Sequence, residues 1–203
     1  AAVKLSRSRQ EVGRLQNEVQ ALKGDDRIPE LIGNSPAMQK VKETIYKLSD
    51  TDANLLILGE NGTGKDLAAR MLRFFSPRRG QVFIPIDLGS IPEQLFTIQE
   101  NLAESEFFGY EKGAFTGAHS DGKEGYFELA NNGTLFLDEI GNLSLPMQAK
   151  LLTAIEKQCI TRLGAVNPIH IDVRLICATN ANLHQLVAEG NFRQDLLYRI
   201  NTI

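Results

Sequence analysis

The chain has 203 residues, 42% of them hydrophobic and 23% charged, which is close to the average for a soluble globular domain with a buried core. Its formal net charge of −3 gives no sign of a nucleic-acid-binding face, so contact with DNA needs a local patch or a domain outside these residues. No apolar run is long enough to cross a bilayer, no signal peptide opens the chain, and the cysteines and histidines match no disulfide or metal-site spacing. A cytoplasmic protein without membrane contact is therefore expected.

The segment that ends at Lys23 is predicted to be a helix, and Gly24 is a typical helix terminator. Its apolar residues follow the a/d spacing of a coiled coil: Leu5, Val12, Leu15, Val19 and Leu22. The spacing covers few heptads, so a dimerising linker and a single helix packed on its own domain both stay open. We favour the linker, because the helix precedes the first globular signal, and divide the chain into a linker at 1–24 and a domain at 25–203.

Beyond the linker, short apolar runs alternate with helical patterns. A helix is expected from Ser35 or Pro36 to Leu48, because Ser35 can cap it and Pro36 suits its first position. Buried strands are expected at residues 54–58, 82–86, 134–137 and 173–178, with helices at 66–75, 148–157 and 183–189. Residues 160–173 indicate a β-hairpin, and residues 201–203 resemble the start of a further strand. This alternation predicts an α/β domain with a parallel sheet covered on both faces.

Residues 59–66 follow the first predicted strand and open a helix. Their sequence matches the phosphate-binding pattern GxxxxGK in the strand–loop–helix context that it requires. The glycines let backbone N–H groups face phosphate oxygens, and Lys65 is expected to neutralise the β- and γ-phosphates. A glycine-rich turn without a ligand is the alternative. The predicted contacts with the nucleotide are Gly59, Glu60, Asn61, Gly62, Thr63, Gly64, Lys65, Asp66 and Leu67.

The last loop position carries Asp66, where this pattern usually has Ser or Thr. A carboxylate can bind magnesium directly or through water, and the ion would then screen its charge from the triphosphate. Alternatively, Asp66 only favours the helix N-terminus.

A second acidic motif ends the apolar run at residues 133–139 and resembles Walker B. Asp138 is expected to hold magnesium, mostly through water, and Glu139 to orient and deprotonate the attacking water. Two solvated loop acids are the alternative.

The hexapeptide GAFTGA occupies residues 113–118 and consists of Gly113, Ala114, Phe115, Thr116, Gly117 and Ala118. Its small residues indicate an exposed loop with an apolar tip. It resembles the signature loop of bacterial enhancer-binding proteins, the AAA+ ATPases that activate sigma-54 RNA polymerase. The resemblance implies a loop at the tip of an insertion in a helix, where Phe115 and Thr116 contact sigma-54 as the nucleotide state changes. An ordinary surface turn with a buried Phe is the alternative.

The resemblance extends from about Ile28 to the end of the chain. It implies that Ile32 and Gly33 lie against the adenine. It also implies that Asn180, in a segment similar to sensor I, hydrogen-bonds near the γ-phosphate or the lytic water; a strand-end turn is the alternative there.

Arg193 and Arg199 match the arginine-finger region of the same family. By analogy they reach into the site of a neighbouring subunit and stabilise charge on the transferred phosphoryl group. Solvated surface arginines are the alternative, and the sequence does not choose between the two as the finger.

The resemblance further implies a three-layer αβα AAA+ P-loop NTPase core with a parallel sheet, whose helical lid is missing from this fragment. ATP and magnesium are the implied cofactors. The implied partners are sigma-54, the RNA polymerase holoenzyme and further copies of the chain, in a ring that usually has six members or in an inactive dimer. DNA contact is assigned to a domain outside these residues, and a preceding receiver domain stays open.

Two features depart from the family pattern. Asp87 stands where the family has an Asn that switches the Walker B glutamate, and one carboxylate cannot donate a hydrogen bond to another unless one is protonated. Additional residues lie within 96–103. Three functions are therefore compared: an ATP-hydrolysing activator, which we favour; a nucleotide-binding oligomerisation module with little hydrolysis; and another AAA+ remodelling ATPase, such as a helicase loader.

Overall fold

The computed structural model describes residues 29–90, 100–114 and 122–201, and every structural statement below is confined to these ranges. The linker helix expected before residue 24 lies outside them, as do residues 115–118 of the GAFTGA motif and the last two residues of the strand expected at 201–203. None of the helices within these ranges is long and apolar enough to span a membrane.

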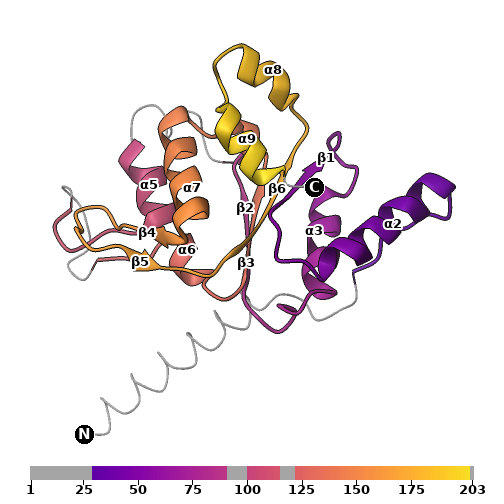
Figure 1. Cartoon of the computed structure of the whole chain (residues 1–203), viewed down its shortest axis with the longest axis horizontal. Helices are drawn as coiled ribbons and strands as arrows, with labels where there is room; N and C mark the ends of the chain where they lie inside the picture. The colour runs from indigo at the N-terminus through magenta and orange to yellow at the C-terminus, as the bar shows by residue number, and fades with distance from the viewer. Residues whose placement is uncertain (1–28, 91–99, 115–121, 202–203) are drawn as a thin grey trace, which may run out of the picture.

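A four-stranded parallel sheet forms the centre of the domain, with its strands in the order β1-β6-β3-β2 (Figure 1). The strands span Leu55–Leu58 (β1), Phe83–Asp87 (β2), Thr134–Asp138 (β3) and Arg174–Thr179 (β6). The four strands expected at residues 54–58, 82–86, 134–137 and 173–178 are confirmed, with their ends shifted by no more than one residue. The connections between neighbouring strands carry helices, as crossovers between parallel strands require.

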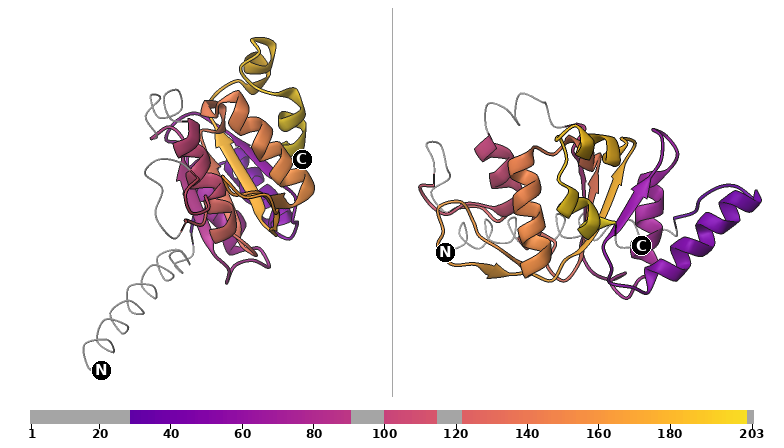
Figure 2. Two further views of the ribbon diagram at one scale, coloured as in Figure 1. Left: turned by 90° about the vertical axis from the view of Figure 1, so that its left-hand side faces the viewer. Right: turned by 45° about the horizontal axis from the view of Figure 1, so that its top comes forward.

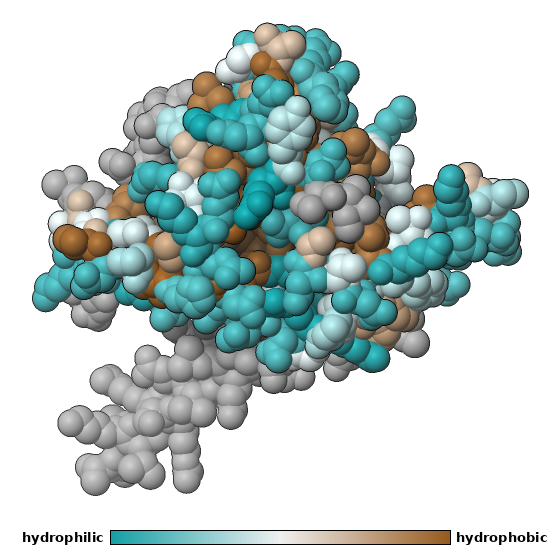
Figure 3. Space-filling view, viewed as in Figure 1, coloured by the Kyte–Doolittle hydropathy of each residue, from teal (hydrophilic) through white to brown (hydrophobic). Residues whose placement is uncertain are grey.

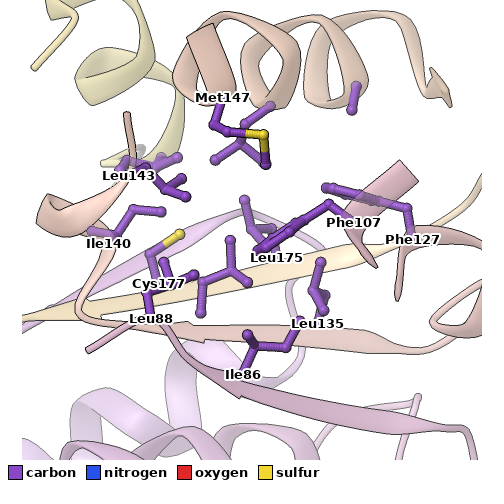
Figure 4. Packing of buried hydrophobic residues seen from close by; sticks show 14 of the residues in the cluster. Ile86, Leu88, Phe107, Phe127, Leu135, Ile140, Leu143, Met147, Leu175 and Cys177 are labelled. Carbon is purple, nitrogen blue, oxygen red and sulfur yellow. The ribbon is translucent and has the colours of Figure 1, made fainter. Parts of the chain in front are cut away.

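Successive side chains on the central strands point to opposite faces of the sheet and build two separate cores. One set joins the larger core, part of which Figure 4 shows: Leu135, Leu137, Leu175 and Cys177. The residues between them join the smaller core: Phe136, Ile176 and Ala178. The central strands are thus buried on both faces, which explains why they read as continuous apolar runs.

Helices cover both faces of the sheet (Figures 1 and 2), so the expected three-layer αβα architecture is confirmed. On one face, α2 (Pro36–Ser49) and α3 (Lys65–Phe74) contribute to the smaller core. The helices that contribute to the larger core are α5 (Glu100–Phe108), α6 (Tyr126–Leu129), α7 (Leu145–Lys157), α8 (Leu183–Ala188) and α9 (Gln194–Ile200).

Four of these helices differ from the sequence expectation, and the four-residue α6 is too short to show a helical periodicity. α7 begins three residues earlier than expected, because Pro146 fits the first turn of a helix. α9 is absent from the expectation, since its 7 residues are too few to show a clear helical periodicity. Residues 100–103, which belong to the stretch that exceeds the family pattern, form the start of α5.

The β-hairpin expected at residues 160–173 is confirmed as an antiparallel pair, β4 (Cys159–Ile160) and β5 (Ile169–His170). It joins the end of α7 to the start of β6. The hairpin therefore directly precedes, along the chain, the strand that ends at Thr179.

Candidate nucleotide-binding site

The predicted site residues lie at one edge of the sheet, because parallel strands present their carboxyl ends together. β1 ends at Leu58, directly before the phosphate loop, and β6 ends at Thr179, directly before Asn180. β2 and β3 end at Asp87 and Asp138, which are partners in the parallel register. The topology thus brings together four segments that are far apart in the sequence.

The phosphate loop has the backbone shape that its glycines suggest. Gly62 and Gly64 have φ angles of 79° and 91°, in the left-handed region that favours glycine. The Gly59 N–H donates to the Thr179 carbonyl at 3.2 Å, and the Thr63 hydroxyl donates to the Glu60 carbonyl at 2.8 Å. The loop is therefore fixed to β6 and opens directly onto the N-terminus of α3, where an anion is favoured.

Lys65 connects the loop with the second acidic motif. The residue is only 8% exposed, although it carries a charge. Its Nζ donates to the Gly59 carbonyl at 3.1 Å and lies 3.3 Å from Oε1 of Glu139. A buried ammonium needs such partners, and phosphate oxygens can serve in the same role.

Glu139 adopts a strained backbone conformation at the centre of the site. Its φ and ψ angles are 55° and 49°, which a residue with a β-carbon adopts at a cost of about 1–3 kcal/mol. Its Oε2 accepts hydrogen bonds from the Asn180 N–H at 3.2 Å and the Thr179 hydroxyl at 3.3 Å. The two carboxylate oxygens are thus held from both sides, by Lys65 and by the end of β6.

Asp138, the first of the two acids of this motif, is partly buried at the end of β3. Burial is the main cause that raises the pKa of its carboxyl, and the charges of Glu139 and Asp87 raise it further. The hydrogen bond from the Glu139 N–H to Asp138 Oδ1, at 2.9 Å, and the charge of Lys65 act in the opposite direction. A divalent cation would relieve this concentration of negative charge.

The residues fit magnesium held mainly by the substrate. Within the described ranges, no group of three or more His, Cys, Asp or Glu side chains is arranged to hold a metal ion. Magnesium in proteins is commonly bound through one or two carboxylates together with phosphates and water, and Asp138 suits that role. Asp66 lies in the first turn of α3, where its carboxylate pairs with Arg70 at 2.9 Å.

Asn180, of the segment similar to sensor I, and Asp87, at the end of β2, lie at the same edge of the sheet. The Asn180 side-chain amide donates to Asn61 Oδ1 at 2.9 Å, so the end of β6 contacts the phosphate loop through side chains as well as backbone. Asp87 Oδ1 accepts the N–H of Gly89 at 2.8 Å and caps its own turn. Thr179 and Asn61 take part in this network, and their polar contacts could not be inferred from the sequence, because they depend on the strand order.

The segment expected to lie against the adenine borders the phosphate loop. Ile32 is 91% exposed, although it is a large apolar residue. Leu31, next to it, is buried, and a β-carbon at Gly64 would lie only 3.3 Å from Leu31 Cδ2. Gly33 has a φ of 139°. Leu67, on α3, is partly buried against the same core.

The two candidate finger arginines lie at opposite ends of α9. Arg193 is the N-cap residue, is exposed, and pairs with Asp195 at 2.6 Å. Its hydrogen bond lowers the pKa of the Asp195 carboxyl. Arg199 lies in the last turn and lines a cavity together with Arg78 and Asp172. About two helical turns separate the two side chains, so they cannot both reach the same position in the site of a neighbouring subunit.

The stem of the GAFTGA loop packs on the β4–β5 hairpin. Tyr110 exchanges two backbone hydrogen bonds of 2.9 Å with Lys123, which closes the stem. Leu163 of the hairpin donates to the Gly109 carbonyl and accepts from the Glu111 N–H, both at 2.9 Å. Gly113 and Ala114 are exposed or partly exposed at the upper end of the stem.

Arg162 adds ionic contacts from the hairpin to one side of the stem and to α6. Its guanidinium binds Glu128 in a bidentate manner, at 2.8 and 2.6 Å, and reaches Glu111 at 3.4 Å. Val166, farther along the hairpin, is 92% exposed, and Figure 3 shows hydrophobic atoms on the surface at this end of the molecule. Arg162 was not predicted to be a functional residue, because a lone arginine in a hairpin is a weak signal in the sequence.

Comparisons with known proteins show the family of the chain. A family model described as sigma-54 interaction domain matches residues 31–203. The nitrogen fixation protein AnfA of Azotobacter vinelandii is 45% identical over 192 residues, which cover 93% of this chain and 34% of AnfA. The response regulator protein PilR of Pseudomonas aeruginosa is 44% identical over 173 residues, which cover 85% of this chain and 37% of PilR. The chain thus spans about a third of the length of these two relatives.

Solved structures show the same fold. NtrX from Brucella abortus, in complex with ATP, has a TM-score of 0.74 and 30% identity, and the match covers 99% of this chain and 40% of that one. The P-loop NTPase domain of an Escherichia coli sigma-54 transport activator has a TM-score of 0.54 at 20% identity, covering 83% and 92% of the two chains. The first likeness concerns a protein that binds ATP, and the second concerns the fold alone.

Proposed function

The chain belongs to the sigma-54 interaction domain family, and on that premise we propose that it is the motor domain of a transcription activator. It binds ATP with magnesium, hydrolyses the γ-phosphate bond, and uses the change in nucleotide state to move the GAFTGA loop against sigma-54 in the RNA polymerase holoenzyme. Further copies of the chain form a ring in which Arg193 or Arg199 completes the site of a neighbour. DNA binding belongs to parts of the whole protein outside these residues.

One observation carries the proposal: the contact between Lys65 and Glu139 at 3.3 Å. A triphosphate at the loop offers the ammonium a stronger set of partners, because it brings several charged oxygens to the N-terminus of α3. Lys65 then turns toward the phosphates and releases Oε1 of Glu139. The freed carboxylate can accept a proton from an attacking water, while magnesium, when bound, supplies charge neutralisation at the phosphates.

Contacts of β6 explain how the same event could reach the loop. Glu139 is bonded to Thr179 and to Asn180, and Asn180 is also bonded to the phosphate loop. The hairpin directly precedes β6 in the chain, and it is bonded to the loop stem through the backbone of Leu163 and through Arg162, which reaches Glu111. A change at Glu139 therefore has a continuous set of packed and hydrogen-bonded segments through which to act.

The test is nucleotide-dependent binding to sigma-54. We expect the chain to bind sigma-54 in the presence of ATP and magnesium and not in their absence, and we expect Thr116→Ala to abolish the binding while ATP affinity stays unchanged. Binding that is independent of nucleotide and survives Thr116→Ala would refute the motor function.

A nucleotide-binding module with little hydrolysis is the second candidate. Two contacts favour it: Asp66 pairs with Arg70, and Asp87 caps the Gly89 N–H, so both acids are engaged in local bonds. ATP turnover decides between the candidates. Equal turnover by the wild type and by Glu139→Gln would support the module, whereas a loss of about two orders of magnitude or more in Glu139→Gln would support the motor.

A further inference from the structure

The 31–33 segment is held in place by contacts on both sides of its exposed residue. On one side, Leu31 is buried and packs against Gly64 of the phosphate loop. On the other side, a β-carbon at Gly33 would lie 3.2 Å from Cγ of Met38, so the segment turns closely over α2. Ile32, between these anchors, is 91% exposed. The segment thus presents one apolar side chain at a fixed distance from the phosphate loop.

Lys42 provides the only charged hydrogen bond to this segment among the described residues. Its Nζ donates to the Gly33 carbonyl at 3.1 Å from the side of α2, and the contact is partly buried. Hydrogen bonds from a charged donor are stronger than neutral ones, and partial burial reduces competition from water. The start of α2 is itself fixed, because the Ser35 hydroxyl accepts the Met38 N–H at 3.2 Å.

We propose that Lys42 is a positioning residue for the nucleotide base: by holding the Gly33 carbonyl, it keeps Ile32 where the base can pack on it. The inference rests on the proposed function, since it requires that the phosphate loop binds a nucleotide. A base joined to phosphates at the loop lies beside the 31–33 segment, because Leu31 touches the loop directly. Lys42 bonds to the Gly33 carbonyl and not to the phosphate loop. Its loss should therefore weaken the contact of the base with Ile32 and leave the binding of the phosphates unchanged.

The roles of base and phosphate can be separated with two ligands, ATP and inorganic triphosphate. Isothermal titration of the 203-residue chain with each ligand, in the presence of magnesium, gives the two affinities. We expect Lys42→Met to weaken ATP binding about tenfold, the effect of losing one charge-assisted hydrogen bond, and to leave triphosphate binding unchanged. Lys42→Arg, which can still donate to the carbonyl, should restore ATP affinity.

Lys47→Met is the matched control, because Lys47 is an exposed residue in the last turn of the same helix. It removes the same charge from α2 and should leave both affinities unchanged. An equal loss of ATP and triphosphate affinity in Lys42→Met would overturn the inference, because it would show a general effect on the loop or on folding. So would unchanged ATP affinity in Lys42→Met.

The failure of the proposed function would look different. If the wild type bound ATP no better than Lys65→Ala does, the phosphate loop would not be a nucleotide site, and both proposals would fall. If the wild type bound ATP in a Lys65-dependent manner while Lys42→Met bound it equally well, only the role of Lys42 would be refuted.

Discussion

At the scale of single residues, the site concentrates charge that the fold alone does not neutralise. Asp87 and Asp138 are register partners, Glu139 follows directly, and Lys65 is the cation bonded to this group. These neighbouring carboxylates repel one another and so lower the stability of the folded chain, but they favour the binding of a cation together with a polyphosphate. Binding strength and stability should therefore respond in opposite directions to changes at Asp138.

Asp138→Asn tests this opposition. The pKa of Asp138 is raised in the folded chain, so the folded state holds the proton more tightly than the unfolded state does. The Asp138 carboxyl therefore costs no stability at low pH, where it is protonated in both states. Its cost to folding grows as the pH rises from the ordinary aspartate pKa to the raised pKa of the folded state, and it is complete above that pKa. At neutral pH we expect Asp138→Asn to raise the urea midpoint of unfolding and to weaken binding of ATP with magnesium. The gain in stability should vanish well below the ordinary pKa of an aspartate, where Asp138 is protonated in both the folded and the unfolded state; a gain that persists there would contradict the assignment.

Thr179→Val tests how Glu139 is held. The Thr179 hydroxyl accepts the Ala181 N–H at 3.0 Å, so its own hydrogen is available for Oε2 of Glu139 at 3.3 Å. Valine has the same shape and removes both bonds. We expect ATP turnover to fall about tenfold while ATP affinity is kept, because a misplaced base affects the chemical step and not the grip on the phosphates.

Thr179→Ser keeps the hydroxyl and should keep turnover. Wild-type turnover in Thr179→Val would show that Lys65 and the Asn180 N–H hold the glutamate without the hydroxyl.

At the scale of secondary-structure elements, the hairpin and the loop stem behave as one unit. Arg162 bonds to Glu111 on one side of the stem and to Glu128 on α6, the helix that follows the other side of the stem. We expect Arg162→Met to weaken nucleotide-dependent binding to sigma-54 about tenfold without changing ATP affinity, since a partly buried bidentate pair helps to orient the loop. Binding to sigma-54 by fluorescence anisotropy, with and without ATP, measures this.

Lys112→Met, an exposed charge on the same stem, serves as the control and should bind as the wild type does. An unchanged affinity in Arg162→Met would mean that the backbone pairing of Leu163 suffices to place the loop.

At the opposite edge of the sheet, Arg78 holds together the segments that lead into three strands. Arg78 bonds to Asp52 at 2.9 Å, to Asp172 at 2.7 Å and to the carbonyl of Gly133 at 3.3 Å, so it joins the segments that enter β1, β6 and β3. We expect Arg78→Met to lower the free energy of unfolding by about 1–2 kcal/mol, because both acids are more than half exposed and solvent screens part of the interaction. Chemical denaturation measures the loss, and ATP affinity should not change. Asp52→Asn, at the more exposed partner, should cost less.

Some of the secondary-structure elements could be predicted from the sequence, and others could not. The four strands could be predicted because β-branched and leucine-rich runs buried on two faces have a distinct length and flanks. The short α9 and the early start of α7 could not, since their boundaries depend on packing against the larger core and on a proline that suits the first turn. The motif residues could be placed at one sheet edge. The contacts of Thr179 follow from the strand order, and those of Arg162 follow from the packing of the hairpin on the loop stem and α6; a local sequence pattern contains neither.

At the scale of the whole molecule, the nucleotide site at the four-stranded sheet and the loop stem on the β4–β5 hairpin are separate regions. The phosphate loop follows the carboxyl end of β1 and Glu139 follows that of β3. The loop stem lies on the hairpin that precedes β6, which Figure 1 labels as β4 and β5. β6 is bonded to β1 on one side and to β3 on the other, so it is the strand through which both regions are connected. Loss of the γ-phosphate is proposed to shift this strand and the hairpin together.

Hydrogen exchange of the peptide covering residues 109–118, measured with and without ATP and magnesium, tests this central claim most directly. We expect ATP to change the exchange of this peptide in the wild type and to leave it unchanged in Lys65→Ala, because the signal begins when Lys65 leaves Glu139. If ATP is bound through Lys65 and the exchange of residues 109–118 stays the same, nucleotide binding and the GAFTGA loop are not coupled, and the motor account is wrong.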